Sequence, residues 1–370
     1  MLFTVGSAGA AIGIGRLSQR RGRRVGLAAG YLTGAVGSAG VVLAAVLDSV
    51  PLLFAALFIY GAGTAANLQA RYAGADLAAP HRQGRAVAIV LVATTVGAVA
   101  GPNVAGAMGR WAQAWGIPSL AGPFVLAGVA YAVGAAVLWT LLRPDPLVLA
   151  RTRERERETS IGSVQPDPTP AEARTRSRGI ATGALVMIVS QMVMIAVMTM
   201  TPLHMRSHGL DVSAVGFVIG VHVAAMYLPS PLSGWLVDRW GAGTVAMLSA
   251  VTFVGAGAVG AWSPPASMPA LTLSLALLGL GWSFGLNAGT AMVTTAAPLA
   301  HRARIQGNVD FLIALAGATG GALSGVVVAG AGFATLALGG GAVALLLVPV
   351  LAVTRAAHPR QRAAGTMAAS

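Results

Sequence analysis

Residues 15–24 read Gly-Arg-Leu-Ser-Gln-Arg-Arg-Gly-Arg-Arg and separate two apolar stretches, 1–15 and 25–47. A related octet, Gly-Trp-Leu-Val-Asp-Arg-Trp-Gly, occupies residues 234–241 in the second part of the chain. A segment that recurs at a distance is the mark of an internal repeat. The octet therefore predicts two halves that share one arrangement of elements.

Two further landmarks keep nearly the same spacing between the halves. The pair His81-Arg82 recurs as His301-Arg302, and the glycines at 101 and 106 recur at 320 and 325. The second half begins near Gly179, and the same spacing places the matching start of the first half before residue 1. We therefore expect that the first helix of the repeat is missing from this chain.

Apolar residues dominate the composition, since 56% of the 370 residues are hydrophobic and 9% are charged. Soluble domains carry roughly a quarter charged residues, whereas a membrane-spanning helix needs about 20 mostly apolar ones. The sequence predicts an all-α membrane protein of two six-helix repeats, with eleven helices because the first is missing. The apolar segments lie at 1–15, 25–47, 51–70, 86–108, 121–142, 180–203, 212–235, 243–262, 269–294, 306–330 and 332–353.

Two residue types are absent, and each absence excludes a class of chemistry. Without cysteine, the chain has no disulfide, thiolate metal site or cysteine nucleophile. Without lysine, it has no Walker A phosphate loop, which excludes ATP-driven pumping by this chain. We therefore expect no ATP partner and no enzymatic activity, and any soft-metal site must be built from methionine and histidine.

All 24 basic residues are arginines, and the net charge is +13. When alternate loops are assigned to alternate sides, every arginine except Arg110 and Arg206 lies on one side. The positive-inside rule makes that side cytoplasmic. The sequence thus predicts a multi-pass protein of the bacterial cytoplasmic membrane, with the lipid bilayer as partner and a cytoplasmic C-terminus. Because topology accounts for the charge, no nucleic-acid partner is expected.

A long polar stretch divides the chain. We expect an N-terminal half at 1–142, a cytoplasmic linker at 143–178, a C-terminal half at 179–354 and a cytoplasmic tail at 355–370. Within residues 151–158 of the linker, each arginine at 151, 153 and 155 has a glutamate three residues later. Opposite charges at this spacing face each other on a helix, which favours a short solvated helix.

The first repeated loop resembles the signature of the major facilitator superfamily, G-x-L-x-D-R-x-G-R-R, with Gln19 in place of the aspartate. The resemblance implies the major facilitator fold, alternating access between two halves, and a loop whose charges gate the movement at the helix ends. The residues that carry it are Gly15, Gln19, Arg20, Gly22 and Arg23 in the first copy, with Asp238 and Arg239 kept in the second.

More than half of the 13 methionines lie between residues 187 and 226. Met194 and Met198 are four apart, as are His222 and Met226, so each pair shares one face of its helix. The two helices are expected to be antiparallel neighbours, with both pairs roughly 15 Å deep in the membrane. Transporter substrates bind near that depth, and thioether with imidazole favours Cu(I).

These two motifs, M-x-x-x-M in the seventh helix and H-x-x-x-M in the eighth, resemble those of the CcoA-like copper importers of the superfamily. The resemblance implies copper import into the cytoplasm, with Met194, Met198, His222 and Met226 as the metal ligands. Copper is then the transported substrate, and no permanently bound cofactor is expected.

Other interpretations stay open. Methionine is a flexible packing residue, and His222 could be a hydrogen-bonded packing residue or a proton relay. Residues 97–106 resemble the antiporter motif G-x-x-x-G-P-x-x-G-G, although Ala105 replaces one glycine and Leu57 stands where such antiporters carry an arginine. A proton-coupled exporter of drugs or small organic molecules, or a riboflavin transporter as in relatives of the same wider group, is therefore an alternative.

Three features outside the central motifs are also candidates. His204, Met205 and His208 cluster at the expected outer mouth, either as a site where metal first binds or as incidental loop residues. Asp310 is expected about one turn inside its helix, either as a proton-linked or gating carboxylate or as an anion stabilised by the helix dipole. Pro229 and Pro231 predict a kink in the eighth helix.

Overall fold

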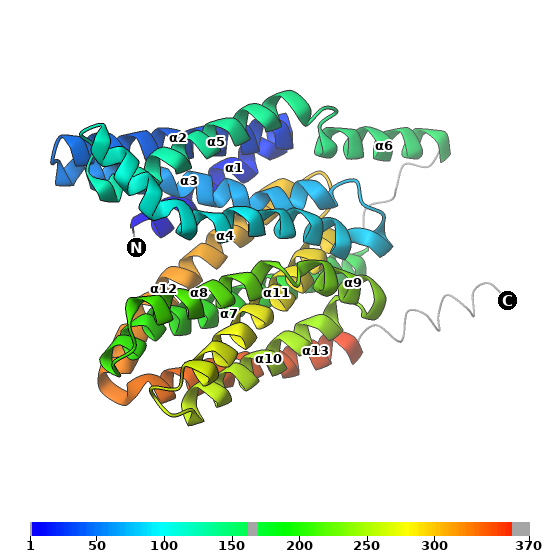
Figure 1. The fold of residues 1–370 in the computed structure, drawn as a ribbon. Helices are drawn as coiled ribbons and strands as arrows, with labels where there is room; N and C mark the ends of the chain where they lie inside the picture. Colours follow the sequence, from blue (N-terminus) through cyan, green and yellow to red (C-terminus); the bar gives the residue numbers. More distant parts are fainter. Residues whose placement is uncertain (1, 162–168, 357–370) are drawn as a thin grey trace. The chain divides into compact units, whose positions relative to one another are not determined.

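The structure is a computed structural model that describes residues 2–161 and 169–356 (Figure 1). These residues are almost entirely helical, and they contain no strand. The helices are α1 (Leu2–Arg21), α2 (Arg23–Val46), α3 (Val50–Ala75), η1 (Pro80–Arg82), α4 (Gln83–Ala114), η2 (Ser119–Ala121), α5 (Gly122–Leu141), α6 (Pro146–Ile161), α7 (Pro170–Ser207), α8 (Val212–Tyr227), α9 (Ser230–Trp240), α10 (Ala242–Trp262), α11 (Met268–Ala296), α12 (Arg302–Leu345) and α13 (Leu347–Ala356).

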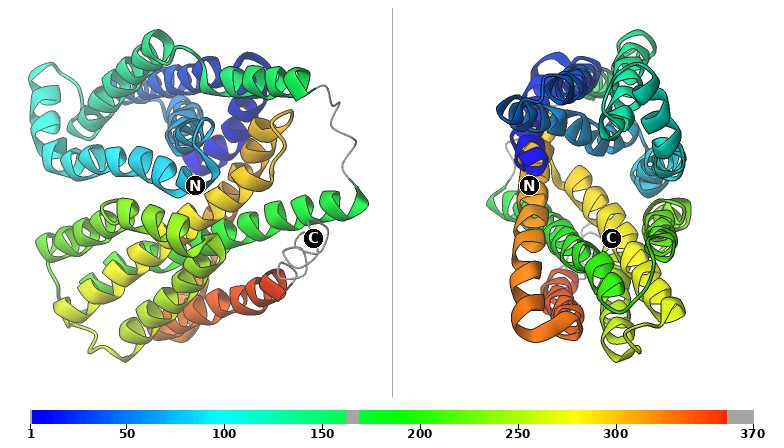
Figure 2. Two further views of the ribbon diagram at one scale, coloured as in Figure 1. Left: turned by 90° about the vertical axis from the view of Figure 1, so that its right-hand side faces the viewer. Right: turned by 60° about the vertical axis from the view of Figure 1, so that its left-hand side comes forward.

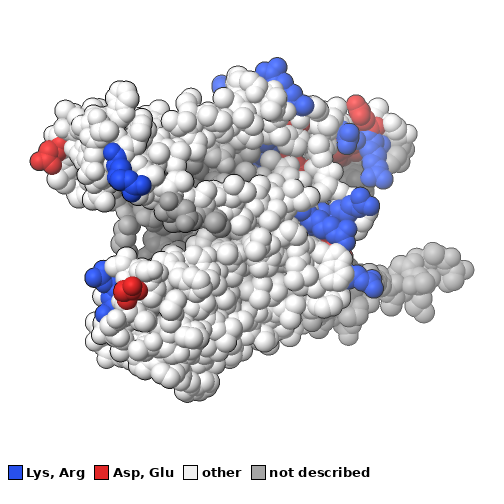
Figure 3. Space-filling model, in the orientation of Figure 1, with Lys and Arg blue, Asp and Glu red and all other residues white. Residues whose placement is uncertain are grey.

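The predicted all-α membrane architecture is confirmed. Among the described residues, eight helices or joined helix runs are long and apolar enough to cross a membrane, and they contain nine of the predicted segments. The two other predicted segments, 1–15 and 86–108, lie in α1 and α4. Charged side chains visible in Figure 3 gather near helix ends, and the surface between them is uncharged.

Several helix limits differ from the expected ones for local reasons. The predicted segment 212–235 is broken into α8 and α9, because Pro229 and Pro231 stand at the junction. The predicted segments 306–330 and 332–353 meet at Gly332, whose φ of 82° bends the chain sharply within α12 (Figure 2). Helix α7 begins at Pro170, well inside the expected linker.

The alternating charges at 151–158 do form a helix, which is α6. It begins beside Asp145, whose Oδ1 accepts hydrogen bonds from the backbone N–H groups of Leu147 and Val148, both at 3.1 Å. The other carboxylate oxygen of Asp145 accepts from the backbone N–H of Arg24, at the start of α2, at 2.7 Å. One aspartate thus stabilises the N-terminal ends of two helices. The predicted tail from residue 357 onward lies outside the described residues.

Contacts divide the chain into two compact units, each of which is described by itself. The first comprises residues 1–169 and 297–319, so it contains α1 to α6 and the beginning of α12. In it, α2 packs on α3 and α5, and α1 packs on α3. A Cβ at Gly34 would lie 2.6 Å from the Cα of Gly63, so only glycine permits this approach of α2 to α3. By contacts, residues 297–319 group with the first unit, although by sequence they belong to the second half.

The second unit comprises residues 170–296 and 320–370, and α11 is its central helix. Helices α7, α8, α9 and α10 all contact α11, and residues 281–291 are buried without interruption. Small residues on α11 allow the neighbouring backbones to approach, since a Cβ at Gly289 would lie 2.6 Å from the carbonyl oxygen of Gly183. The stretch 281–291 of α11 is therefore the buried centre of this unit.

Candidate functional site

His222 is held at the buried interface of α8 and α11. Its side chain is fully buried, and its Nδ1 lies 2.8 Å from the carbonyl oxygen of Leu275. Because a carbonyl oxygen can only accept, Nδ1 must carry the proton, and Nε2 therefore presents a lone pair. Nε2 is buried and has no hydrogen-bond partner among the described residues. A histidine that donates through one nitrogen to a backbone carbonyl and keeps the other free is in the state in which metals bind it.

Met226 lies one turn beyond His222 on the same face of α8, and only 7% of its surface is exposed. Both residues are brought close to α11 by Gly279, where a Cβ would lie 2.5 Å from the carbonyl oxygen of His222 and 3.1 Å from the backbone nitrogen of Met226. The predicted H-x-x-x-M pair is therefore buried against one point of α11, at Gly279.

Met194 reaches the same level of α11 from α7. The two helices run antiparallel, because Gly183 lies beside Gly289 and Gln191 accepts a hydrogen bond from Trp282 Nε1 at 2.7 Å. Met194 lies three residues beyond Gln191 on α7, and Gly279 lies three residues before Trp282 on α11. Because the helices are antiparallel, Met194 is therefore level with Gly279. Met194 is 2% exposed.

The second methionine of the α7 pair, Met198, is partly buried one turn further along. Helices α7 and α8 contact each other only slightly, so the expected direct packing of these helices is wrong. They flank α11 instead, and Trp282 links them, since it donates to Gln191 on α7 and its ring meets that of Tyr227 on α8 at 5.5 Å. The structure thus brings Met194, His222 and Met226 to one level of a shared partner.

Clusters of harder ligands are not found in the described part of the chain: no three His, Asp or Glu side chains gather where they could hold a metal ion. The candidate donors near this level of α11 are thioethers and one imidazole. Such a set suits a soft ion and is a poor site for Mg²⁺ or Ca²⁺, which prefer several oxygen ligands.

The expected outer cluster is only partly formed. The rings of His204 and His208 lie 4.4 Å apart, and that of His204 stacks on Phe333 at 4.3 Å. His208 is exposed, whereas Met205 between them is fully buried. Because Met205 turns into the protein interior, a three-residue site with an exposed thioether is not present here.

Gln19, from the first signature loop, makes four hydrogen bonds to the chain around the start of α12. Its Oε1 accepts from the backbone nitrogens of Ala303 and Arg304 at 2.9 and 3.3 Å. Its Nε2 donates to the carbonyl oxygens of Ala300 and Leu299 at 2.7 and 3.4 Å. The glutamine therefore contacts the α12 N-terminus without supplying the negative charge of an aspartate.

The glycines of the two signature loops share a conformation that confirms the repeat. Gly22 has φ 93° and ψ 166°, and Gly241 has φ 85° and ψ 149°. Each ends one helix and begins the next with a positive φ, which side chains disfavour. Asp238 and Arg239 of the second copy lie in the last turn of α9, where Arg239 is exposed.

Arg23, from the same loop, is buried in a charge cluster of the first unit. Its Nε donates to Asp76 Oδ2 at 2.7 Å, and its Nη2 donates to Gln306 Oε1 on α12. Arg302 lies 3.9 Å from the other oxygen of Asp76. Asp76 and Gln306 were not among the sequence candidates.

A second buried ion pair joins α3 to α12. Arg71 Nη2 donates to Asp310 Oδ1 at 2.6 Å, and the hydroxyl of Tyr72 donates to the same oxygen at 3.2 Å. Asp310 is 2% exposed, and its Oδ2 has no hydrogen-bond partner among the described residues. Since α12 begins at Arg302, Asp310 lies more than two turns inside, and the expectation of one turn, with stabilisation by the helix start, is wrong.

Arg71 was missed because the predicted span ended at residue 70. A longer span would have placed an arginine inside an apolar helix, which by itself indicates function. In the antiporter-like stretch, a Cβ at Gly97 or Gly101 would meet no described atom within 4 Å.

Nearly the whole chain matches one family of known proteins. The profile of the Major Facilitator Superfamily covers residues 1–178 and 183–369. The chain belongs to this superfamily. It is therefore a multi-pass secondary transporter of the major facilitator superfamily (MFS) and not an enzyme.

Curated relatives of this MFS chain are bacterial. The uncharacterised MFS-type transporter YdeG of Bacillus subtilis (strain 168) is 53% identical over 354 residues, which are 96% of this chain and 82% of YdeG. YddS of the same organism is 49% identical over 350 residues, 95% of this chain and 80% of YddS. The riboflavin transporter RfnT of Brucella anthropi is 29% identical over 367 residues, 95% of this chain and 84% of RfnT.

Solved structures agree on the fold. The human organic anion transporter MFSD10 has a TM-score of 0.72 at 17% identity, covering 94% of this chain and 82% of that one. The proton:xylose symporter XylE has a TM-score of 0.70 at 17% identity, covering 94% and 83%. At this identity the likeness concerns the MFS fold alone.

Proposed function

We propose that this MFS transporter imports copper across the bacterial cytoplasmic membrane. The observation that carries the proposal is His222, whose Nε2 is buried without a hydrogen-bond partner among the described residues, while Nδ1 donates to the carbonyl oxygen of Leu275. Leaving such an acceptor unpaired costs about 1–3 kcal/mol. An ion that binds Nε2 would offset that cost. A residue needed only for packing could be apolar and would leave no acceptor unpaired.

The donor set favours Cu(I) among the common metals. Met194, Met226 and His222 supply two thioethers and a neutral imidazole at one level of α11, and Met198 adds a third thioether one turn away. Thioethers bind soft Cu(I) well and hard cations poorly. These donors hold no charge, so the ion is bound without a carboxylate that would retain it, which suits a substrate that must leave again.

Alternating access would expose this site to each side in turn, without ATP and without a nucleic-acid partner. We place the arginine-rich face and the C-terminus in the cytoplasm, by the positive-inside rule. In this orientation the signature loop and the cluster of Arg23 with Asp76 form the inner gate. Gln19 connects that gate to α12 through hydrogen bonds alone.

Asp310 is the carboxylate that we propose to couple transport to protons. Its Oδ1 takes the hydrogen bonds of Arg71 and Tyr72, while Oδ2 is free to accept a proton. A proton there would cancel the charge that holds Arg71, so the contact between α3 and α12 would weaken. Arg23 is a further cation close to this pair, since its guanidinium carbon lies 5.7 Å from the centre of the Tyr72 ring.

The test is copper accumulation by cells that express the chain in a strain lacking its own copper importers. We expect uptake of ⁶⁴Cu above that of the empty vector, in the presence of ascorbate to keep copper reduced. Manganese, which prefers oxygen ligands, is the matched control and should not accumulate. Equal copper in expressing and empty cells, with the protein present in the membrane, would overturn the proposal.

His204 and His208 are proposed as the place where copper first binds, on the outer side. The double change His204→Ala with His208→Ala is expected to raise the copper concentration that gives half-maximal uptake by about tenfold, since two imidazole ligands are lost. Maximal uptake should stay unchanged, because the buried site is intact. A lower maximum with an unchanged half-saturating concentration would contradict this role.

Riboflavin is the second candidate substrate, because RfnT matches 95% of this chain at 29% identity. The same cells supply the discriminating measurement, with radiolabelled riboflavin in place of copper. Riboflavin uptake that is insensitive to His222→Ala, together with absent copper uptake, would assign the vitamin. If the cells take up neither copper nor riboflavin but expel a dye or drug, the protein is the exporter of the alternative interpretation.

A further inference from the structure

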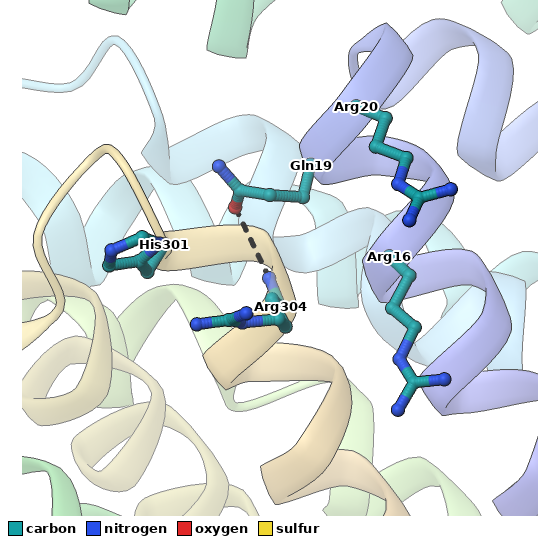
Figure 4. Close-up of a pocket in the computed structure, with 5 residues that line it drawn as sticks. All are labelled: Arg16, Gln19, Arg20, His301 and Arg304. Carbon is teal, nitrogen blue, oxygen red and sulfur yellow. Dashed lines mark hydrogen bonds between the residues drawn. The ribbon is translucent and has the colours of Figure 1, made fainter.

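A pocket lies between the end of α1 and the start of α12, within the first unit (Figure 4). Its volume is about 310 Å³, at the small end of ligand pockets, which span roughly 300–1,000 Å³. The lining residues are Arg16, Gln19, Arg20, His301 and Arg304.

The charges around this pocket all have one sign. Arg16, Arg20 and Arg304 are exposed, none of them forms an ion pair with an acidic residue of the described chain, and no acidic residue lines the pocket. Figure 4 shows the side chains of Arg16 and Arg20 extending from α1 away from α12, and the side chain of Arg304 extending toward His301 at the start of α12. Several exposed arginines around one pocket, with no acidic residue in its lining, make the local potential positive, which attracts an anion.

The start of α12 adds to the attraction for an anion. The positive end of a helix dipole favours negative charge within the first turn. Gln19 satisfies the backbone N–H groups of Ala303 and Arg304 but brings no charge. The second copy of the loop carries Asp238 at the matching position, so the first copy lacks an acid that its repeat retains.

We propose that this pocket binds a phosphate group at the arginine-rich face. Guanidinium groups bind phosphate oxygens in pairs, with short charge-assisted hydrogen bonds. The pocket lies at the end of α1 and at the start of α12, which belongs to a helix run long and apolar enough to span a membrane. The phosphates of anionic lipid headgroups lie at the ends of such helices, and basic pockets on the cytoplasmic side bind such headgroups. Inorganic phosphate offers the same chemistry from solution.

A phosphate in this position would contact both α1 and α12. It would stabilise their contact beside the bonds that Gln19 makes, and so favour the conformation described here. The site is distinct from the buried methionine and histidine site, and it does not depend on the identity of the transported substrate.

The test measures the thermal unfolding of the purified chain in detergent. One arm adds phosphatidylglycerol, with phosphatidylcholine as the uncharged comparison, and the other adds sodium phosphate, with sodium chloride at matched ionic strength. We expect phosphatidylglycerol, phosphate or both to raise the unfolding temperature above the comparison. Stabilisation by the lipid alone identifies a headgroup site, and stabilisation by phosphate alone identifies a soluble anion.

Two triple variants locate the effect. Arg16→Gln, Arg20→Gln and Arg304→Gln together should weaken the stabilising ligand by at least about tenfold, since each removes a charge-assisted contact. The matched control changes Arg174, Arg176 and Arg178, which are equally exposed at the start of α7, to glutamine. If the pocket triple does not fold, Arg304→Gln alone carries the measurement. No stabilisation by either ligand, or an equal loss in both triples, would overturn the proposal.

Discussion

His222→Ala is expected to lower copper uptake by about 100-fold or more while the protein still reaches the membrane. The imidazole supplies the one nitrogen donor of the proposed site, and loss even of a partner behind a metal ligand costs about 10–100-fold in affinity. The cavity that alanine leaves will also lower the unfolding temperature. His222→Gln, which is closer in size, therefore serves as the second variant, and uptake is measured per copy of membrane-inserted protein.

Methionine variants separate ligation from packing at the same site. Met194→Leu keeps nearly the same volume and removes the sulfur, so folding should change little and copper uptake should fall at least tenfold. Met187→Leu is the matched control, because Met187 is also buried on the face of α7 that packs on α11. Equal uptake by Met194→Leu and Met187→Leu would show that Met194 only fills space.

Asp310→Asn is expected to cost the folded protein about 3–5 kcal/mol, because it leaves the buried charge of Arg71 without the carboxylate that pairs with it. The measurement is thermal or denaturant unfolding of the purified chain. Asp48→Asn is the matched control, since Asp48 is exposed before α3 and should change stability by less than about 0.5 kcal/mol.

A double variant and a transport readout test what the pair does. Replacing both charges, with Arg71→Met and Asp310→Leu, should recover most of the lost stability, as for other buried pairs. If Asp310 couples transport to protons, this stable double variant still exchanges internal for external copper but gains nothing from an imposed pH gradient. Gradient-driven uptake equal to that of the unchanged chain would leave the pair a structural role only.

Much of the architecture follows from local pattern. Apolar segments of helical length predicted the spans, and the octet at 234–241 predicted the repeat that Gly22 and Gly241 confirm in their backbone angles. These features are local because each helix satisfies its own backbone hydrogen bonds in lipid. Helix ends were less predictable, since α7 begins with a polar stretch from Pro170 before its apolar part.

The contacts of the buried charges in the first unit were beyond such patterns. Arg71 and Asp310 stand 239 residues apart, and Arg23 and Gln306 stand 283 apart. Nothing in the neighbourhood of either residue specifies its partner, and a charged residue near a helix end is usually solvated. Their pairing arises because α12 packs with α2 and α3 in the first unit, which buries charges that would otherwise face water.

By themselves, composition and periodicity determined that this chain is a helical membrane protein and that any soft-metal site must use methionine and histidine, because these are properties of the chain alone. The signature loop added the resemblance to the major facilitator superfamily, which the family profile confirms. Only the tertiary structure decided what surrounds the candidate donors. It packs α7 and α8 on α11 and leaves Nε2 of His222 without a hydrogen-bond partner among the described residues, because burial and hydrogen bonding depend on helices that are distant in sequence.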